Sequence, residues 1–192
     1  MPRAKRTNIR PDDAKLREAI LYLSILTERD RHCGAIKLNK LLFYSDFLAY
    51  RRFGEPITGQ QYQRLTWGPC PRRMKPVLEA MEKAGDIATR EEPVFGRFKQ
   101  KRTFAKRTAD LSHFSPAEVD LFREVVDRFW DTSATDISDL SHDFIGWQLA
   151  KDGETIPYGT VLIGTRKPTD REIKIGRHLE KFARETLSRN AR

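Results

Sequence analysis

The sequence predicts a mainly helical α+β fold with a small antiparallel sheet and hairpin, in an order that partly resembles a winged helix. Three observations carry this prediction. Residues 36–52 repeat apolar side chains at helical spacing on two faces. Residues 57–66 have the alternation of a strand. Residues 87–103 contain the breakers of a hairpin, Glu92-Pro93 and Phe95-Gly96.

Composition narrows the class of protein. With 192 residues, 39% hydrophobic and 10% aromatic, the chain suits one domain with extensions and can bury a core without disulfide or metal staples. Its two cysteines, Cys33 and Cys70, do not make the disulfide framework of a secreted protein. No apolar run approaches the ~18 residues of a membrane helix, and the basic start lacks the apolar part of a signal peptide. We therefore expect a cytoplasmic protein with no membrane partner.

The first helix is predicted to begin at Pro11-Asp12-Asp13, where acidic side chains suit the positive end of the helix dipole. The core helix follows at residues 36–52, and Gly54 offers its left-handed stop. Leu38, Leu41 and Leu42 mark one apolar face of this helix. Phe43, Phe47 and Tyr50 mark a second face, so we expect neighbours on two sides.

The middle of the chain is predicted to form the sheet. The strand at Ile57–Thr66 leads into a turn at Gly68-Pro69-Cys70-Pro71, because two prolines remove two hydrogen-bond donors and fix two φ angles. A helix then runs to a stop at Gly85. We expect the strand to share one sheet with the hairpin at residues 87–103.

The last third is predicted to be helical. Ser115-Pro116-Ala117-Glu118 is a strong helix start, with a cap, a proline at the first position and Glu three residues after the cap. Residues 131–143 hold four aspartates and no Lys or Arg, which makes an acidic stretch in a chain of net charge +9. We divide the chain into a mobile basic tail (1–10), a main domain (11–165) and a basic C-terminal helix or docking arm (166–192).

Several runs in the main domain carry a family resemblance. They are Lys37-Leu38-Asn39-Lys40-Leu41-Leu42-Phe43-Tyr44, Gly54-Glu55-Pro56-Ile57, Trp67-Gly68-Pro69, Ile137-Ser138-Asp139-Leu140-Ser141-His142 with Trp147, and Gly153-Glu154-Thr155-Ile156-Pro157-Tyr158. Their order and spacing resemble the Panacea domain of SocA-like and GepA-like antitoxins, over roughly Ala35 to Gly164. The polar strand centre at residues 60–64 and Cys70 depart from the pattern of that family.

The resemblance implies a domain that binds proteins rather than one that transforms substrates. It implies an antitoxin that neutralises a co-encoded protein toxin by direct binding, with no cofactor and no turnover. The resemblance also leaves open an alternative in which the protein delivers its toxin partner to a protease. Because such domains pair with unrelated toxins, the sequence does not name the toxin.

The chemistry of the side chains agrees with a protein that is not an enzyme. His142-Asp143 with Asp139 invites a metal or acid-base interpretation, but a site needs three or four convergent ligands and the chain has four histidines in all. Cys70 lacks the surrounding motif of a nucleophile. No glycine-rich phosphate loop is present. We therefore expect neither a catalytic residue nor a metal site.

A protein partner is expected to contact aromatic and basic side chains, which are favoured anchors at interfaces. The candidates are Tyr44, Tyr62, Trp67, Pro69, Arg72 and Arg73. For Tyr44, as for Phe47 and Tyr50, helical spacing is also typical of simple core packing.

The rival hypothesis is a winged-helix regulator that binds DNA. The helix after Trp67 would then be the recognition helix and the basic hairpin the wing. The candidate contacts are Arg97, Lys99, Lys101 and Arg102. We expect only weak or autoregulatory DNA binding, and homo-oligomerisation stays an open alternative.

Overall fold

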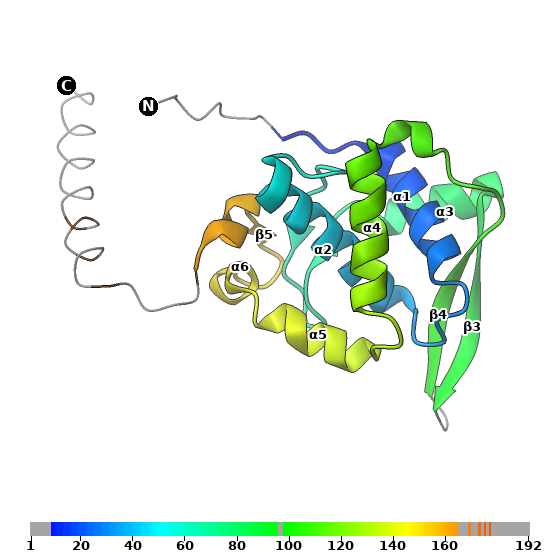
Figure 1. Ribbon diagram of the computed structural model, residues 1–192. Helices are drawn as coiled ribbons and strands as arrows, with labels where there is room; N and C mark the ends of the chain where they lie inside the picture. The colour runs from blue at the N-terminus through cyan, green and yellow to red at the C-terminus, as the bar shows by residue number, and fades with distance from the viewer. Residues whose placement is uncertain are drawn as a thin grey trace.

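The structure has the predicted mainly helical α+β fold (Figure 1). This computed structural model describes residues 9–95 and 98–164, with residues 169, 173, 175 and 177. The α-helices are α1 (Asp13–Leu26), α2 (Ala35–Phe53), α3 (Met74–Ala84), α4 (Pro116–Arg128), α5 (Ala134–His142) and α6 (Ile145–Leu149). The strands are β1 (Tyr62–Gln63), β2 (Cys70–Pro71), β3 (Ile87–Phe95), β4 (Phe98–Ala105) and β5 (Thr155–Ile156), and two 3-10 helices are η1 (Leu111–His113) and η2 (Tyr158–Leu162).

Helix α2 lies at the centre and packs on both sides, as its two apolar faces predict. Leu38, Leu41 and Leu42 belong to the larger core cluster, which α2 shares with α1, α3 and α4. Phe43 and Phe47 belong to a second, aromatic cluster. A fully buried side chain of this size contributes about 1.5–3 kcal/mol by leaving water. The two clusters together make α2 the element around which the domain is assembled.

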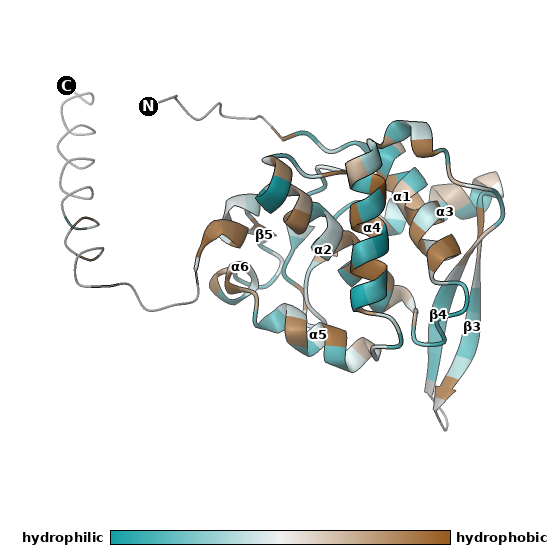
Figure 2. Ribbon diagram, in the orientation of Figure 1, coloured by the Kyte–Doolittle hydropathy of each residue, from teal (hydrophilic) through white to brown (hydrophobic). Residues whose placement is uncertain are grey.

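The helix starts follow the predicted capping signals. The Asp12 carboxylate accepts a hydrogen bond from the backbone N–H of Lys15 at 2.9 Å and caps α1. Ser115 and Glu118 form a reciprocal capping box at the start of α4. Teal and brown bands alternate along α4 in Figure 2, as expected for an amphipathic helix with one side buried.

The strand prediction was wrong in extent and in pairing. Only Tyr62–Gln63 of the predicted strand is extended in a sheet, and it pairs with β2 on one side and β5 on the other. The preceding backbone is already engaged, because Thr58 donates its N–H to Asp46 and accepts the N–H of Asp12. Cys70–Pro71 is therefore an edge strand and not the middle of a turn.

The hairpin forms a second, separate sheet. Strands β3 and β4 pair antiparallel from Ile87 opposite Ala105 to the tip, and they project from the helical body in Figure 1. They pack against α1 and α3 and make no ladder with β1. The chain thus has the order of a winged helix but not one shared sheet.

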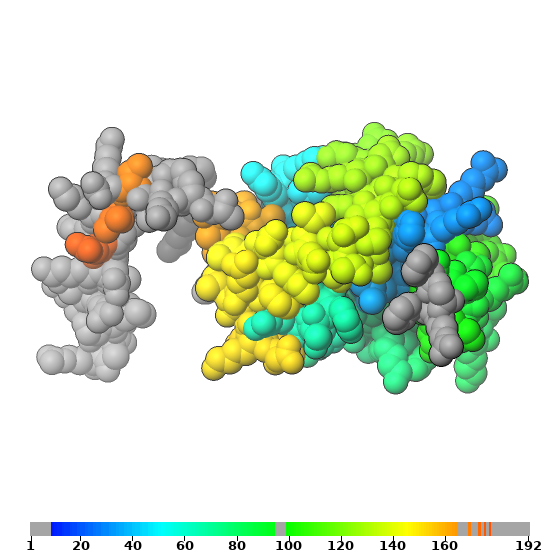
Figure 3. All heavy atoms as spheres, turned by 90° about the horizontal axis from the view of Figure 1, so that it is seen from below, coloured from blue at the N-terminus to red at the C-terminus, as the bar shows by residue number. Residues whose placement is uncertain are grey.

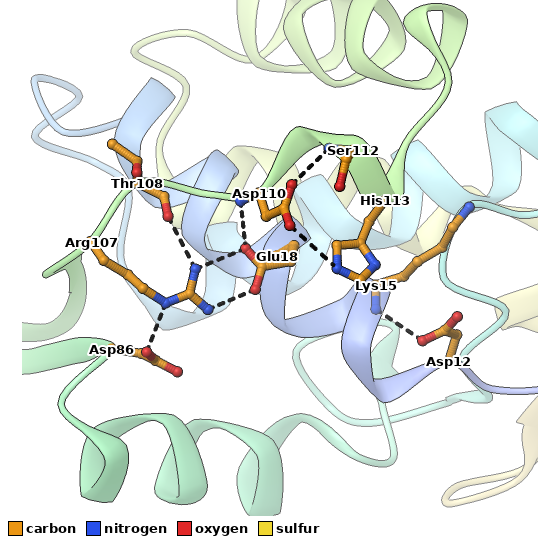
Figure 4. A network of polar contacts seen from close by, with 9 residues as sticks. All are labelled: Asp12, Lys15, Glu18, Asp86, Arg107, Thr108, Asp110, Ser112 and His113. Carbon is orange, nitrogen blue, oxygen red and sulfur yellow. Dashed lines mark hydrogen bonds and ion pairs between the residues drawn. The ribbon is translucent and has the colours of Figure 1, made fainter.

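Arg107 fastens the exit of this hairpin to the helices (Figure 4). Its guanidinium pairs with Glu18 of α1 at 2.6 Å and with Asp86 at 2.7 Å, and Glu18 also accepts the backbone N–H of Asp110. The hydrogen bonds from Arg107 lower the pKa of the Glu18 carboxyl. This cluster holds the hairpin in a fixed orientation.

Cys33 and Cys70 are free thiols. Across residues 9–95 and 98–164, no helix is long and apolar enough to cross a membrane. The division into tail, domain and arm stays a prediction, since residues 1–8 and most of 166–192 lie outside the described part.

Candidate functional site

The turn before β2 presents Trp67 to solvent. Its indole is 64% exposed, and Leu65 beside it is 38% exposed. The backbone N–H of Gly68 closes the turn on the carbonyl of Leu65 at 2.9 Å. Gly68 has a φ of +90°, a conformation that L side chains rarely adopt. An exposed tryptophan on a closed turn is the strongest candidate contact residue of the domain.

Buried polar groups hold this turn from beneath. Lys40 of α2, only 2% exposed, donates from Nζ to the carbonyl of Pro69 at 3.2 Å. Ser138 of α5 donates from its hydroxyl to the carbonyl of Trp67 at 3.0 Å. A Cβ atom at Gly68 would overlap the side chain of Ser141 and come within 2.7 Å of Lys40 Cε. The turn is therefore fixed at its backbone, while the Trp67 side chain is free to face a partner.

Burial also shifts the pKa values of the two ionisable groups under the turn. Desolvation lowers the pKa of Lys40 to about 8. It raises the pKa of the Cys70 thiol to about 11, in spite of the nearby ammonium. The thiol is protonated at neutral pH, which makes it a poor nucleophile.

A second aromatic side chain borders the turn. Trp147 of α6 donates from Nε1 to the carbonyl of Leu65 at 3.3 Å. The Arg64 guanidinium lies 4.2 Å above the Trp147 ring, and the His142 ring stacks on it at 4.1 Å. Figure 3 looks onto this side, where the teal 62–72 segment lies beside the yellow residues of α5 and α6. We call Leu65, Trp67, Trp147 and Arg64 the Trp67 surface.

Arg72 and Arg73 are exposed near this surface but already have partners within the domain. Arg72 donates to the carbonyl of Gly153 and, at 3.2 Å, to the side chains of Gln63 and Thr155. Arg73 pairs with Asp13 at the start of α1. Both guanidinium groups therefore bind other parts of the domain as well as facing solvent.

The remaining candidates for partner contact are buried or largely covered. Tyr62 is 1% exposed and Pro69 is buried. Tyr44 is largely covered and stacks on Phe129 with a centroid distance of 4.6 Å, and burial raises its pKa to about 12. Thus the structure brings Trp67, Arg72 and Arg73 to the surface, places Tyr62 in the aromatic core cluster, buries Pro69 in the turn, and sets Tyr44 in a separate groove.

Sequence reasoning missed a buried carboxylate. Asp46 of α2 is fully buried and accepts hydrogen bonds from the Thr58 backbone N–H at 2.7 Å, the Thr58 hydroxyl and the Tyr62 hydroxyl at 2.8 Å. Tyr158 completes the cluster by donating to the carbonyl of Gln60 at 2.7 Å. Desolvation raises the pKa of Asp46, and these donors oppose the shift. The available signal was a lone acid on an apolar face of the core helix.

A buried ion pair was missed in the same way. Lys37 Nζ lies 2.6 Å from Asp30 Oδ2, and both side chains are 1% exposed. Lys37 also donates to the carbonyl of Thr132 at 2.8 Å, and Asp30 accepts the backbone N–H of His32 at 3.0 Å. This pair links α2 to the loop that precedes it and to the loop that precedes α5.

The candidate DNA contacts differ in their exposure and in their ion pairs. Arg97 lies outside the described residues. Arg102 is 8% exposed, pairs with Glu92 at 2.8 Å and donates to the carbonyl of Glu28 at 2.9 Å. Lys99 lies 3.6 Å from Glu91, and Lys101 is opposite Glu91 in the register. Lys99, Lys101 and Arg102 thus each have an acidic neighbour on the partner strand.

The described side chains include no set suited to a metal. No three His, Cys, Asp or Glu residues among them lie close enough together to hold an ion. His142 packs on Trp147 and lies 4.0 Å from Asp139. What the Trp67 surface offers chemically is an aromatic and cationic contact area.

Comparison with known proteins identifies a family. Residues 38–148, more than half of the chain, match the family model described as antitoxin SocA-like, Panacea domain. No curated protein gives a significant match, and no solved structure does. The matched range contains the Trp67 turn and helices α3 to α5.

Proposed function

Because this chain belongs to the SocA-like antitoxin family with a Panacea domain, we propose that it neutralises a co-encoded protein toxin by binding it directly through the Trp67 surface. The observation that supports this surface is the 64% exposure of Trp67 on a turn whose carbonyls are held by Lys40 and Ser138. The proposal requires no cofactor and no catalytic group.

The physical case rests on preorganisation. Binding normally costs the entropy of ordering loops and side chains at an interface. Here the turn is already ordered, and Trp147 is fixed by its bond to the Leu65 carbonyl. An anchoring tryptophan can contribute about 2 kcal/mol or more when a partner desolvates it. The exposed indole is therefore the best-placed anchor on this face.

The DNA-binding alternative has less support. A reader of DNA needs a continuous phosphate-contacting surface of Lys and Arg side chains. Arg102 is buried in an ion pair, and Lys99 has an acidic neighbour. We propose no more than weak, non-specific binding to DNA.

The test is co-expression of the protein with its gene neighbour. We expect the neighbour alone to arrest growth, and the wild-type protein to restore growth and co-purify with it. Trp67→Ala should weaken the complex by roughly 30-fold, the equivalent of about 2 kcal/mol. The dissociation constant and rescue of growth are measured together.

Trp130→Ala is the matched control, because Trp130 is also exposed, at 46%, but lies two residues beyond the end of α4. Thermal melts should show that both variants keep the fold. Unchanged affinity of Trp67→Ala would refute the surface. The absence of any toxic neighbour and of any co-purifying protein would refute the role itself.

A further inference from the structure

Two adjoining hollows form a groove along α5. The first has a volume of about 400 Å³ and lies between α2, α4 and α5, and the second has a volume of about 560 Å³ and reaches the segment after η2. Asp143 and Phe144 line both, so the two hollows lie next to each other. We call this hollow the α5 groove.

The α5 groove has apolar walls that face solvent. Leu140 is 51% exposed, Leu162 is 63% exposed and Ile163 is 48% exposed. Tyr44 and Phe129 form a stacked floor in the first hollow. Several large apolar side chains uncovered along one groove are a feature of binding surfaces rather than of ordinary surface.

The charge along α5 is negative. Asp131, Asp136, Asp139 and Asp143 are exposed, and residues 129–150 contain no Lys or Arg. Within the described residues these aspartates form no ion pair with Lys or Arg, and two of them have only histidine neighbours, His32 at 3.5 Å and His142 at 4.0 Å. The positive side chains that line the groove are Arg128 in the first hollow and Arg51 in the second. A segment that fits should be mainly basic with some acidic residues.

The chain's own C-terminal segment has this composition. Residues 166–192 hold nine Lys and Arg against four Asp and Glu, and Asp170 and Glu172 come near its beginning. Ile175, Leu179 and Phe182 have the spacing of one helical face. Of these residues the structure describes Ile175, which is 49% exposed, and the nearby Ile173, which is 37% exposed.

The segment also begins where the groove ends. Gly164 lines the second hollow, and four residues separate it from Thr169. Intramolecular docking over so short a link has a high effective concentration, so modest contacts are sufficient. The first acidic residues of the segment would meet Arg51, and its later basic residues would meet the aspartates of α5.

We propose that residues 169–187 dock in the α5 groove of the same chain, covering Leu140 and Leu162 with Ile175, Leu179 and Phe182 while Lys174 and Lys181 face the α5 aspartates. This contact is independent of the toxin-binding proposal, because the Trp67 surface does not include the groove.

Zero-length carbodiimide cross-linking of the full chain tests the contact, because it joins only lysine amines and carboxylates that touch. Mixing labelled and unlabelled copies separates bonds within one chain from bonds between chains. We expect bonds within one chain from Lys174 or Lys181 to Asp136, Asp139 or Asp143. We also expect the backbone amides of α5 to exchange hydrogen about tenfold more slowly than in an undocked variant. This slowing corresponds to a ratio of docked to undocked chains of roughly ten to one.

The undocked variant is Leu179→Asp with Phe182→Asp, which leaves every cross-linking group in place. Its control is Ser188→Asp with Asn190→Asp, which adds the same charge at polar positions and should behave as wild type. Raising the salt to 1 M should weaken docking, because the Debye length falls to about 3 Å. Equal cross-linking and α5 exchange in both variants would overturn the proposal, as would bonds found only between labelled and unlabelled chains.

Discussion

Asp46→Ala is expected to destabilise the domain by roughly 3–6 kcal/mol, because each buried donor left without an acceptor costs about 1–3 kcal/mol. The substitution removes the acceptor for the Thr58 backbone N–H, the Thr58 hydroxyl and the Tyr62 hydroxyl. It also opens a cavity beside Tyr62, which belongs to the aromatic cluster. At roughly 2–4 °C per kcal/mol, thermal unfolding should occur about 6–24 °C lower.

Asp46→Asn is the matched control, since it keeps the shape and one acceptor oxygen but cannot ionise. Burial raises the folded-state pKa of Asp46 above its ordinary value of 3.8. The folded state therefore binds this proton more tightly than the unfolded state, and stability from Asp46 is full below the ordinary pKa and falls as pH rises above it. Urea unfolding should show that the free energy of unfolding of the wild type falls relative to that of Asp46→Asn as the pH rises from 4 upward.

When the wild type is compared with Asp46→Asn, the contributions of the other carboxyl groups to the pH dependence of stability cancel. The pKa values of Glu18 and Asp13 are lowered by their arginine partners, which gives stability that is lost as pH falls, the opposite sign. These groups are the same in wild type and variant. A difference that stays constant with pH would show that the folded and unfolded states bind this proton equally, so that burial does not raise the pKa of Asp46.

The second large effect is expected at the buried ion pair. Asp30→Ala leaves the Lys37 ammonium, 1% exposed, without a counter-charge, and should cost about 3–5 kcal/mol. The double variant Asp30→Ala with Lys37→Met removes both charges and should recover most of this loss, although the Thr132 carbonyl loses a donor. Chemical denaturation of wild type, both single variants and the double variant measures the coupling.

If the two single losses simply add in the double variant, Lys37 and Asp30 do not act as a pair. Arg52 and Glu124 provide a comparison, because they pair bidentately on the surface, with side chains 42% and 50% exposed. Disrupting that surface pair should cost about 1 kcal/mol or less.

Local signals in the sequence were enough for most of the helices. The two-faced pattern of α2, its stop at Gly54 and the capping box at Ser115 are all present as predicted. Such signals are readable because caps and periodicity involve residues within a few positions of each other. The strand at residues 57–66 was overestimated because Thr58 bonds to Asp46 and Asp12, which pattern alone does not reveal.

The candidate site was predicted only in part, for a related reason. Tyr62 and Trp67 lie five positions apart and look alike in sequence, yet Tyr62 is 1% exposed and Trp67 is 64% exposed. The difference comes from their contacts with α2. The Tyr62 hydroxyl donates a hydrogen bond to the buried Asp46, whereas at Trp67 helix α2 binds only the backbone that follows, through Lys40. Burial of this kind depends on contacts between distant segments.

The three buried charged residues of α2 have one property in common: each bonds to a main-chain atom of a neighbouring loop. Lys40 binds the carbonyl of Pro69, Lys37 binds the carbonyl of Thr132, and Asp46 binds the N–H of Thr58. A backbone carbonyl is present whatever side chain its residue carries. The outer residues of these loops can therefore change identity while the loops keep their positions, so one scaffold can present differently shaped contact surfaces without redesign of its interior.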